Sequence, residues 1–268
     1  MRLLGNVYLV GCGSWCGGLR LSRGGSCNVY LVDGGTELAL IDAGDLDGIE
    51  DMLKNIRSLG FDPANIRKIF LTHAHYDHTL GLEMLLKHVK ATVYGHSIAR
   101  ETLGGHSITH ETLGQGPGIY QPGLHITIIP APVHEIVKQG DSVKVGSVTM
   151  NVVELPGHTP DGLGFTIQLS EGTGCFTGDT AIGDQPMPDN SVVPGCIGWI
   201  DAAWRSNLLH HMASLKLLQA MNLAAFFPGH GISQRTPEQV KLSLEHCVGR
   251  LDSLLAIPNL GTMMRVAL

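Results

Sequence analysis

Four side chains that can bind metal ions fall within one short stretch of the chain, Thr72-His73-Ala74-His75-Tyr76-Asp77-His78. His73 and His75 stand two residues apart, so on an extended backbone they point the same way, while Asp77 and His78 can turn toward a second point nearby. Imidazole nitrogen and carboxylate oxygen suit zinc, and they also accept iron or manganese. The stretch therefore predicts a centre for two metal ions. The alternative is that 14 histidines in 268 residues cluster here by chance.

The same residue types recur in four further motifs, which stand in the order Leu40-Ile41-Asp42-Ala43-Gly44, Leu155-Pro156-Gly157-His158-Thr159-Pro160, Phe176-Thr177-Gly178-Asp179-Thr180 and Phe227-Pro228-Gly229-His230-Gly231. Together with His-x-His-x-Asp-His, these motifs resemble the metallo-β-lactamase superfamily of hydrolases, and in particular its glyoxalase II and lactonase-like branches. The resemblance extends from about residue 28 to residue 231, so it rests on five ordered motifs rather than on one short pattern.

The resemblance implies a role for each of these side chains. Seven of them would be metal ligands: His73, His75 and His158 for one ion, Asp77, His78 and His230 for the other, and Asp179 as the bridge. Two zinc ions per chain are expected, with iron or manganese as the other candidates. A hydroxide between the ions, available near neutral pH because the pKa of bound water falls toward ~7, would attack an ester, lactone or thioester carbonyl.

Within this scheme, Asp77 and Asp179 would be the catalytic carboxylates, with Asp77 handling the proton. Asp42 would hold the histidine loop by hydrogen bonds rather than touch a metal ion.

Asp179 narrows the expected chemistry within the family. True β-lactamases of this type lack a bridging carboxylate at this motif, so β-lactamase activity is disfavoured. Glyoxalase II-like thioesterases, lactonases and phosphodiesterases share the Asp, but the first group adds a basic, aromatic C-terminal extension that is not found here. Lactonases that open acyl-homoserine lactones place a Tyr where this sequence has Ile182. A persulfide dioxygenase-like enzyme with a single iron is the alternative from another class, and a non-catalytic binding module is the third.

Length and charge limit the kind of partner. A chain of 268 residues with 43% hydrophobic content suits one large α/β domain with a sizeable core. A net charge of −6 with only 18 scattered Lys and Arg argues against a nucleic-acid surface, so a small-molecule substrate is expected. The six cysteines are interpreted as reduced thiols. Without a signal peptide or a membrane-length apolar stretch, a cytoplasmic protein with no membrane partner is expected, and a homodimer is left open.

Hydrophobic patterning predicts the elements that position the motifs. In the first half it predicts strands at 7–10, 28–32 and 67–72, and helices at about 46–59, capped by Asp45, and at 80–89. In the second half it predicts strands near 124–130, 142–145, 147–154, 163–169, 173–177 and 224–227, and helices at 204–221 and 236–256. Strand-rich halves, each covered by helices on one face, predict a four-layer αββα sandwich, which the resemblance also implies, in one domain over 1–268.

An insert is predicted at about 96–123, where residues 96–104 are nearly repeated as residues 106–114. Two such copies cannot build a solenoid, so a local duplication is expected. Its glycines suggest a mobile lid over the substrate, and a surface or dimer-contact loop is the other interpretation. His106 and His110 are either metal-binding or solvated surface histidines. An apolar pocket is expected from the aromatic residues Trp15, Tyr120, Trp199 and Trp204, although core packing is equally open for Trp204.

Overall fold

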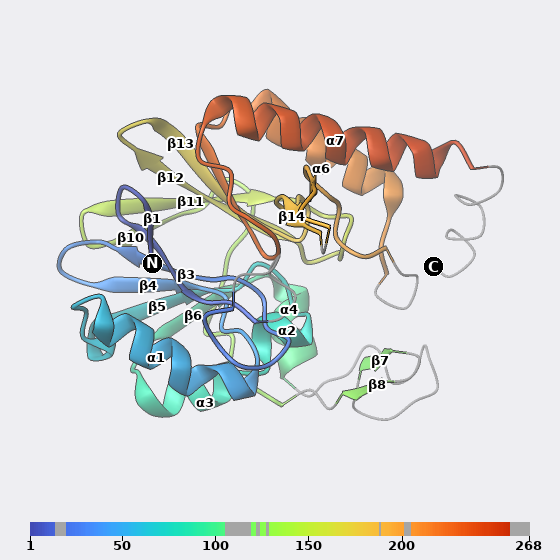
Figure 1. The fold of residues 1–268 in the computed structure, drawn as a ribbon. Coiled ribbons are helices and arrows are strands. Elements are labelled where there is room, and N and C mark those ends of the chain that lie inside the picture. Colours follow the sequence, from blue (N-terminus) through green and yellow to red (C-terminus); the bar gives the residue numbers. More distant parts are fainter. Residues whose placement is uncertain are drawn as a thin grey trace.

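The computed structural model describes residues 1–13, 20–104, 119–121, 124–126, 129–187, 189–200 and 205–257. Two β-sheets lie face to face, and helices cover the outer face of each sheet (Figure 1). The chain therefore forms the predicted αββα sandwich. No helix within the described ranges is both long enough and apolar enough to cross a membrane.

The first sheet has seven strands in the spatial order β1 Arg2–Leu4, β2 Val7–Gly11, β3 Val29–Asp33, β4 Leu38–Ile41, β5 Ile66–Phe70, β6 Thr92–Gly95 and β9 Glu135–Ile136. Strands β1 to β4 are antiparallel, whereas β4, β5, β6 and β9 run parallel. Because parallel strands end at the same edge, the chain segments after β4, β5 and β6 emerge together. Asp42 and the histidine motif follow β4 and β5 at that edge.

The second sheet has five strands in the order β10 Ser142–Val145, β11 Val148–Glu154, β12 Leu163–Leu169, β13 Gly172–Gly178 and β16 Ala225–Pro228. Strands β13 and β16 pair in parallel, with Phe176 opposite Phe227. The turns that follow these two strands carry Asp179 and His230, so parallel pairing brings both residues to one edge.

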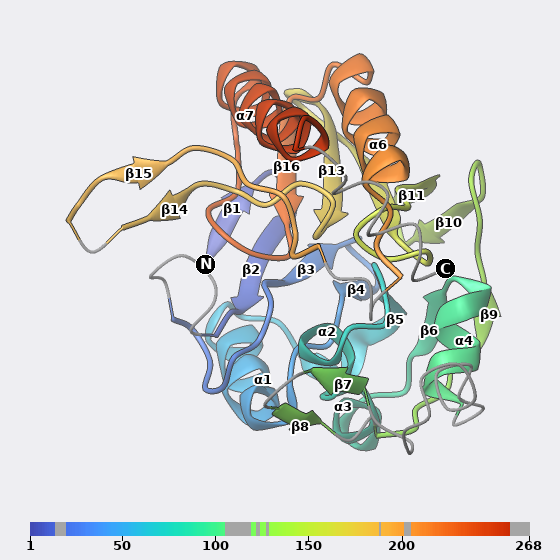
Figure 2. The same ribbon diagram turned by 90° about the vertical axis from the view of Figure 1, so that its right-hand side faces the viewer.

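Helices α1 Ile49–Ser58 and α3 Leu82–His88 lie on the outer face of the first sheet, and α6 Leu208–Ala220 and α7 Pro237–Leu255 on that of the second (Figure 2). The shorter helices are α2 Tyr76–Thr79 and α4 Ser97–Leu103, with 3-10 turns at Leu46–Gly48 and Pro63–Asn65. Asp45 caps the first of these 3-10 turns, which leads into α1, by accepting the Gly48 N–H. Thr236 caps α7 by accepting the Gln239 N–H.

Three separate apolar clusters correspond to the three interfaces between these four layers. Because successive side chains of a strand point to opposite faces, Leu31 and Leu40 pack with Met52 on the helix side of the first sheet. Tyr30 and Ile41, one residue along, fall in the cluster between the sheets. A third cluster joins the second sheet to α6 and α7 and contains Phe226, Leu215 and Leu244.

One predicted strand has a different partner from the one expected. The strand predicted at 124–130 is β8 Leu124–Ile126, which forms a separate two-stranded hairpin with β7 Ile119–Gln121 and does not join the second sheet. An alternating pattern predicts a strand but not its partner, and the two-residue separation of β7 and β8 favours local pairing. A second hairpin, β14 Gln185–Pro186 with β15 Val192–Val193, also stands apart from the sheets.

Part of the predicted insert lies outside the described residues, including 105–118 with His106 and His110, so the lid interpretation stays a prediction. Trp15 and Trp204 and the side chain of Tyr120 are likewise outside the described part. The described cysteines at positions 27, 175, 196 and 247 are free thiols, as expected.

Candidate metal centre

The seven side chains expected to bind metal meet between the adjoining edges of the two sheets. The segment after β5 supplies His73 and His75, and α2 supplies Asp77 and His78. The turns after β11, β13 and β16 supply the other three, His158, Asp179 and His230. All seven are buried, with at most 8% of any of them exposed. Residues separated by more than 150 positions in the sequence are thus neighbours in the fold.

The first group consists of His73, His75, His158 and Asp179, whose candidate ligand atoms lie within 4.8 Å of one another. His75 Nδ1 is 3.0 Å from His73 Nε2 and 2.9 Å from His158 Nε2. A neutral ring nitrogen has a single proton or a single lone pair, so it cannot satisfy both neighbours well. Ligands of a tetrahedral zinc ion at about 2.0–2.1 Å lie roughly 3.3 Å apart. The convergence of these nitrogens therefore fits a bound cation.

The second group consists of Asp77, His78 and His230. Asp77 Oδ2 is 3.0 Å from His230 Nε2 and 3.7 Å from His78 Nε2. His78 Nε2 is buried and has no hydrogen-bond partner among the described residues. A buried polar atom without a partner is costly, and a metal ion at this point would satisfy it.

Asp179 lies between the two groups. Its Oδ2 atom is 3.5 Å from His158 Nε2 in the first group and 3.5 Å from His230 Nε2 in the second. Its Oδ1 atom is 3.4 Å from His78 Nε2. One carboxylate thus faces ligand atoms of both groups, which is the arrangement that a bridging ligand requires. The donor set of imidazoles and carboxylates suits zinc, iron or manganese.

The charges around the histidines differ between the groups. In the first group, burial and the neighbouring imidazoles lower the pKa of His73 and of His75 well below the ordinary value, so both rings are neutral. In the second group, burial also lowers the pKa of His230, but the carboxylates of Asp179 and Asp77 outweigh it and raise that pKa to about 10. A positively charged His230 thus balances carboxylates that a metal ion would otherwise neutralise.

Asp42 orients His78. Its Oδ2 atom accepts a hydrogen bond from His78 Nδ1 at 2.8 Å, and its two oxygens also accept bonds from the backbone N–H and the hydroxyl of Thr72, both at 2.8 Å. With Nδ1 engaged in this way, Nε2 is the ring atom available to the second group. Asp42 adopts a positive φ of 61°, a conformation that Asp tolerates better than most residues.

Cys27 forms a third set of neighbouring donors with Asp42 and His78. Burial raises the pKa of its thiol to about 12, so the thiol is protonated. Since the Nδ1 atom of His78 donates to Asp42, we interpret these three residues as the set that orients His78 for the second group and not as a separate metal site.

Trp199 orients His158 in the same manner. The Trp199 carbonyl accepts a hydrogen bond from His158 Nδ1 at 2.8 Å, which leaves Nε2 facing the first group. Trp199 as a residue is 73% exposed. The backbone of an exposed aromatic residue thus contacts a candidate ligand.

Two buried polar residues that sequence analysis did not single out hold the ligand loops. Asp161 accepts the Ala74 N–H at 2.9 Å, between His73 and His75. Asn28 donates its amide to the carbonyls of Pro228 and Gly231, at 3.0 and 2.9 Å, on either side of His230. In the sequence, Asp161 is marked only as an Asp that follows the Pro-Gly-His motif, and Asn28 only as a polar residue at the start of an apolar strand. Neither feature indicates which residue the side chain contacts.

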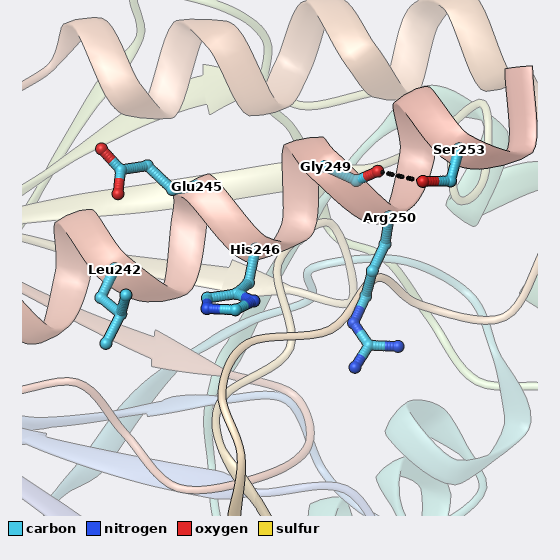
Figure 3. Close-up of a pocket in the computed structure, with 6 residues that line it drawn as sticks. All are labelled: Leu242, Glu245, His246, Gly249, Arg250 and Ser253. Carbon is cyan, nitrogen blue, oxygen red and sulfur yellow. Dashed lines mark hydrogen bonds between the residues drawn. The ribbon is translucent and has the colours of Figure 1, made fainter. Parts of the chain in front are cut away.

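A surface hollow with a volume of about 400 Å³ lies apart from this centre. It lies on the outer face of α7 (Figure 3), and its lining residues are Leu242, Glu245, His246, Gly249, Arg250 and Ser253. All six come from one helix, and none belongs to the groups described above.

Comparison with known proteins identifies the family of the chain. The sequence profile of the metallo-beta-lactamase superfamily matches residues 22–230. Over 233 residues the chain is 25% identical to an atrochrysone carboxyl ACP thioesterase of Aspergillus fumigatus, covering 85% of this chain and 43% of the relative. It is 26% identical to the thioesterase pkgB of Emericella nidulans, covering 86% and 53%. The chain thus spans about half the length of these curated relatives.

Solved structures share the fold. A metallo-beta-lactamase variant from Cronobacter sakazakii superposes with a TM-score of 0.71 at 18% identity, covering 96% of both chains. The native metallo-beta-lactamase of Legionella gormanii superposes with a TM-score of 0.68 at 19% identity, covering 95% of this chain and 94% of that one. At such low identity these structures are evidence for the fold alone.

Proposed function

The chain belongs to the metallo-β-lactamase superfamily, and from this premise we propose that it is a binuclear metal-dependent hydrolase of small-molecule thioesters or esters. The observation that carries the proposal is the position of Asp179, whose Oδ2 atom lies 3.5 Å from ligand atoms of both groups. A site for a single ion would not need a carboxylate shared between two sets of converging donors.

In this proposal His73, His75 and His158 would hold the first ion, Asp77, His78 and His230 would hold the second, and Asp179 would be shared between them. Two bound ions would polarise the substrate carbonyl and lower the pKa of a bound water toward ~7. Proton transfer would be carried out by side chains of the protein. Burial raises the pKa of Asp77, but His78 and His230 outweigh it, so the net shift is downward. Asp77 is therefore ionised and can accept a proton inside the closed site.

Two features support a carbonyl substrate. Several relatives are named thioesterases, including the two compared above. Trp199, whose backbone carbonyl accepts the hydrogen bond from His158, is largely exposed, and its indole would offer an apolar surface to an acyl group. Lactones remain within the proposed class, because their carbonyl presents the same chemistry.

The test combines metal analysis with a substrate panel. We expect protein loaded with Zn²⁺ to hold two ions per chain and to hydrolyse thioesters or esters faster than phosphodiesters or β-lactams. His158→Ala should lose one ion and most turnover, whereas the exposed control His246→Ala on α7 should lose neither. Full metal content and full turnover in His158→Ala would refute the ligand assignment. One iron per chain with no hydrolysis would instead favour the dioxygenase, and faster phosphodiester cleavage would overturn the substrate class.

A further inference from the structure

Helix α6 packs against the turn that carries His158. The first turn of the helix is capped by Asn207, whose side chain accepts the N–H groups of Leu209 and His210, both at 3.0 Å. A cap of this kind satisfies donors that the helix itself leaves without partners, so the position where α6 begins is well defined.

Three consecutive carbonyls of the Pro-Gly-His turn accept hydrogen bonds from this helix and the two residues before it. The Pro156 carbonyl accepts from Ser214 Oγ at 2.7 Å, the Gly157 carbonyl from the Asn207 N–H at 2.7 Å, and the His158 carbonyl from Ser206 Oγ at 2.6 Å. Each bond fixes one peptide unit, so the backbone leading to the His158 ring has little freedom.

His211 connects this turn to the turn that carries Asp179. Its imidazole is fully buried, and Nε2 lies 2.7 Å from the carbonyl oxygen of Thr180, the residue that follows Asp179. A carbonyl can only accept, so Nε2 carries the proton and donates it. On its other side, the backbone of His211 lies against Gly157, where a Cβ would overlap it. Gly157 has a φ of 139°, which is accessible mainly to glycine.

We propose that His211 is a positioning residue for the metal centre, which through its hydrogen bond to Thr180 sets the place of Asp179 relative to His158. These two candidate ligands lie 3.5 Å apart in the first group, and both belong to the second half of the chain. His73 and His75 come instead from the segment after β5, where the Ala74 N–H between them donates to Asp161. The inference rests on the proposed function, because it presumes that the first group binds an ion.

If His211 had a purely structural role, any side chain that fills the same volume in the core would serve equally well. His211 lies on α6 beside the apolar cluster that contains Met212 and Leu215, so leucine could replace its volume. Leucine cannot donate a hydrogen bond, whereas glutamine carries an amide N–H at a reach similar to that of Nε2. The pair His211→Leu and His211→Gln therefore separates filling of the core from the hydrogen bond.

The experiment measures Zn²⁺ affinity by chelator competition and the visible absorption of the Co²⁺-loaded protein, for the unchanged chain and three variants. Loss of a partner that orients a metal ligand typically costs about 10–100-fold in metal affinity, and we expect this for His211→Leu, with altered Co²⁺ bands. His211→Gln should stay within a few-fold of the unchanged chain. His210→Leu, the matched control on the exposed face of the same helix, should leave both measurements unchanged.

The outcomes separate this inference from the proposed function. If the unchanged chain binds neither Zn²⁺ nor Co²⁺, the proposed function fails and the inference fails with it. If the unchanged chain binds them and His211→Leu has the same affinity and the same bands, only the inference is overturned. Equal losses in His211→Leu and His211→Gln would also overturn it, because the hydrogen bond would then not be what matters.

Discussion

At the scale of single residues, the two groups of donors differ in how many protons a metal ion must displace. The histidines of the first group are neutral because burial lowers their pKa. His230 in the second group is protonated, since Asp179 and Asp77 raise its pKa to about 10 against the effect of burial. Its lone pair becomes available to a metal ion only after that proton leaves.

Burial also lowers the pKa of His78, but Cys27 and the carboxylates of Asp77, Asp179 and Asp42 outweigh it and hold that pKa well above its ordinary value. We therefore predict that filling the second group releases about two protons at about pH 7.5, one from His230 and one from His78. The affinity of the second ion should rise with pH by roughly a hundredfold per unit while both rings are protonated. Calorimetric titration with Zn²⁺ in two buffers of different ionisation enthalpy measures the protons released. His230→Ala should reduce that number by about one. An affinity for the second ion that stays constant between about pH 7 and 8.5 would contradict the prediction.

The sequence was informative about which side chains gather but not about which of their atoms do so. Spacing and motif order bring His73, His75 and His158 together. The choice of ring nitrogen depends on what the other nitrogen binds, as with His158, whose Nδ1 donates to the Trp199 carbonyl. That carbonyl lies 41 positions away in the chain, and no local pattern marks it.

At the scale of elements, the loops that carry the ligands are fixed from neighbouring strands and helices. Asn28, next to the first residue of β3, is the clearest case because it holds the loop after β16. Its side chain is 3% exposed and donates to the carbonyls of Pro228 and Gly231, and its backbone N–H donates to Gly229 at 2.6 Å. A link between the two sheets thus sets the position of His230.

We predict that Asn28→Ala lowers the free energy of unfolding by about 1–3 kcal/mol, because two buried carbonyls lose their side-chain donor. It should also weaken binding of the second ion, since His230 is no longer held. Asn55→Ala is the matched control: its amide donates to the carbonyls of Val10 and Leu21, both at 2.9 Å, and none of these residues belongs to either donor group. Thermal unfolding and Zn²⁺ titration of both variants give the comparison. If both variants lose metal affinity equally, general loosening is the cause and not the His230 loop.

The hydrophobic pattern of the sequence predicted the boundaries of a helix or strand well where that element has a pronounced apolar face. Helix α1 lies within the predicted range, and Gly60, with a φ of 87°, stands just after its end. Strand pairing did not follow so readily. Both β8 and β9 come from one stretch of the sequence, yet β9 joins the edge of the first sheet and β8 pairs only with β7. A pattern of period two reports a buried face but carries no information about the partner.

At the scale of the whole molecule, the candidate metal centre is divided between the two halves of the sandwich. The first half contributes His73, His75, Asp77 and His78, and the second contributes the other three candidate ligands. Periodicity alone indicated only an α/β protein. The two strand-rich halves, together with the order of the five motifs that resemble a known family, predicted the four-layer sandwich. The apolar cluster between the two sheets holds the two halves together. Metal ions bound by residues of both halves would connect them a second time.

The last prediction follows from this division. Anything that binds only the folded state stabilises it, by about 2.7 kcal/mol at a free ligand concentration of 100 times the dissociation constant. Removing the metal with a chelator should therefore lower the unfolding temperature, and restoring Zn²⁺ should raise it again. This alone would hold for an ion bound anywhere, so the location of the effect matters.

Hydrogen exchange, followed by mass spectrometry with and without Zn²⁺, gives that location. Because each proposed ion would draw ligands from both halves, Zn²⁺ should slow exchange simultaneously in the segment 72–79 and in the turns at 155–160, 177–182 and 228–231. The α7 segment around His246, which holds no ligand, serves as the internal control and should exchange at the same rate in both states. Protection confined to 72–79 would show that the ions are held by the first half alone, and the link between the halves would then be wrong.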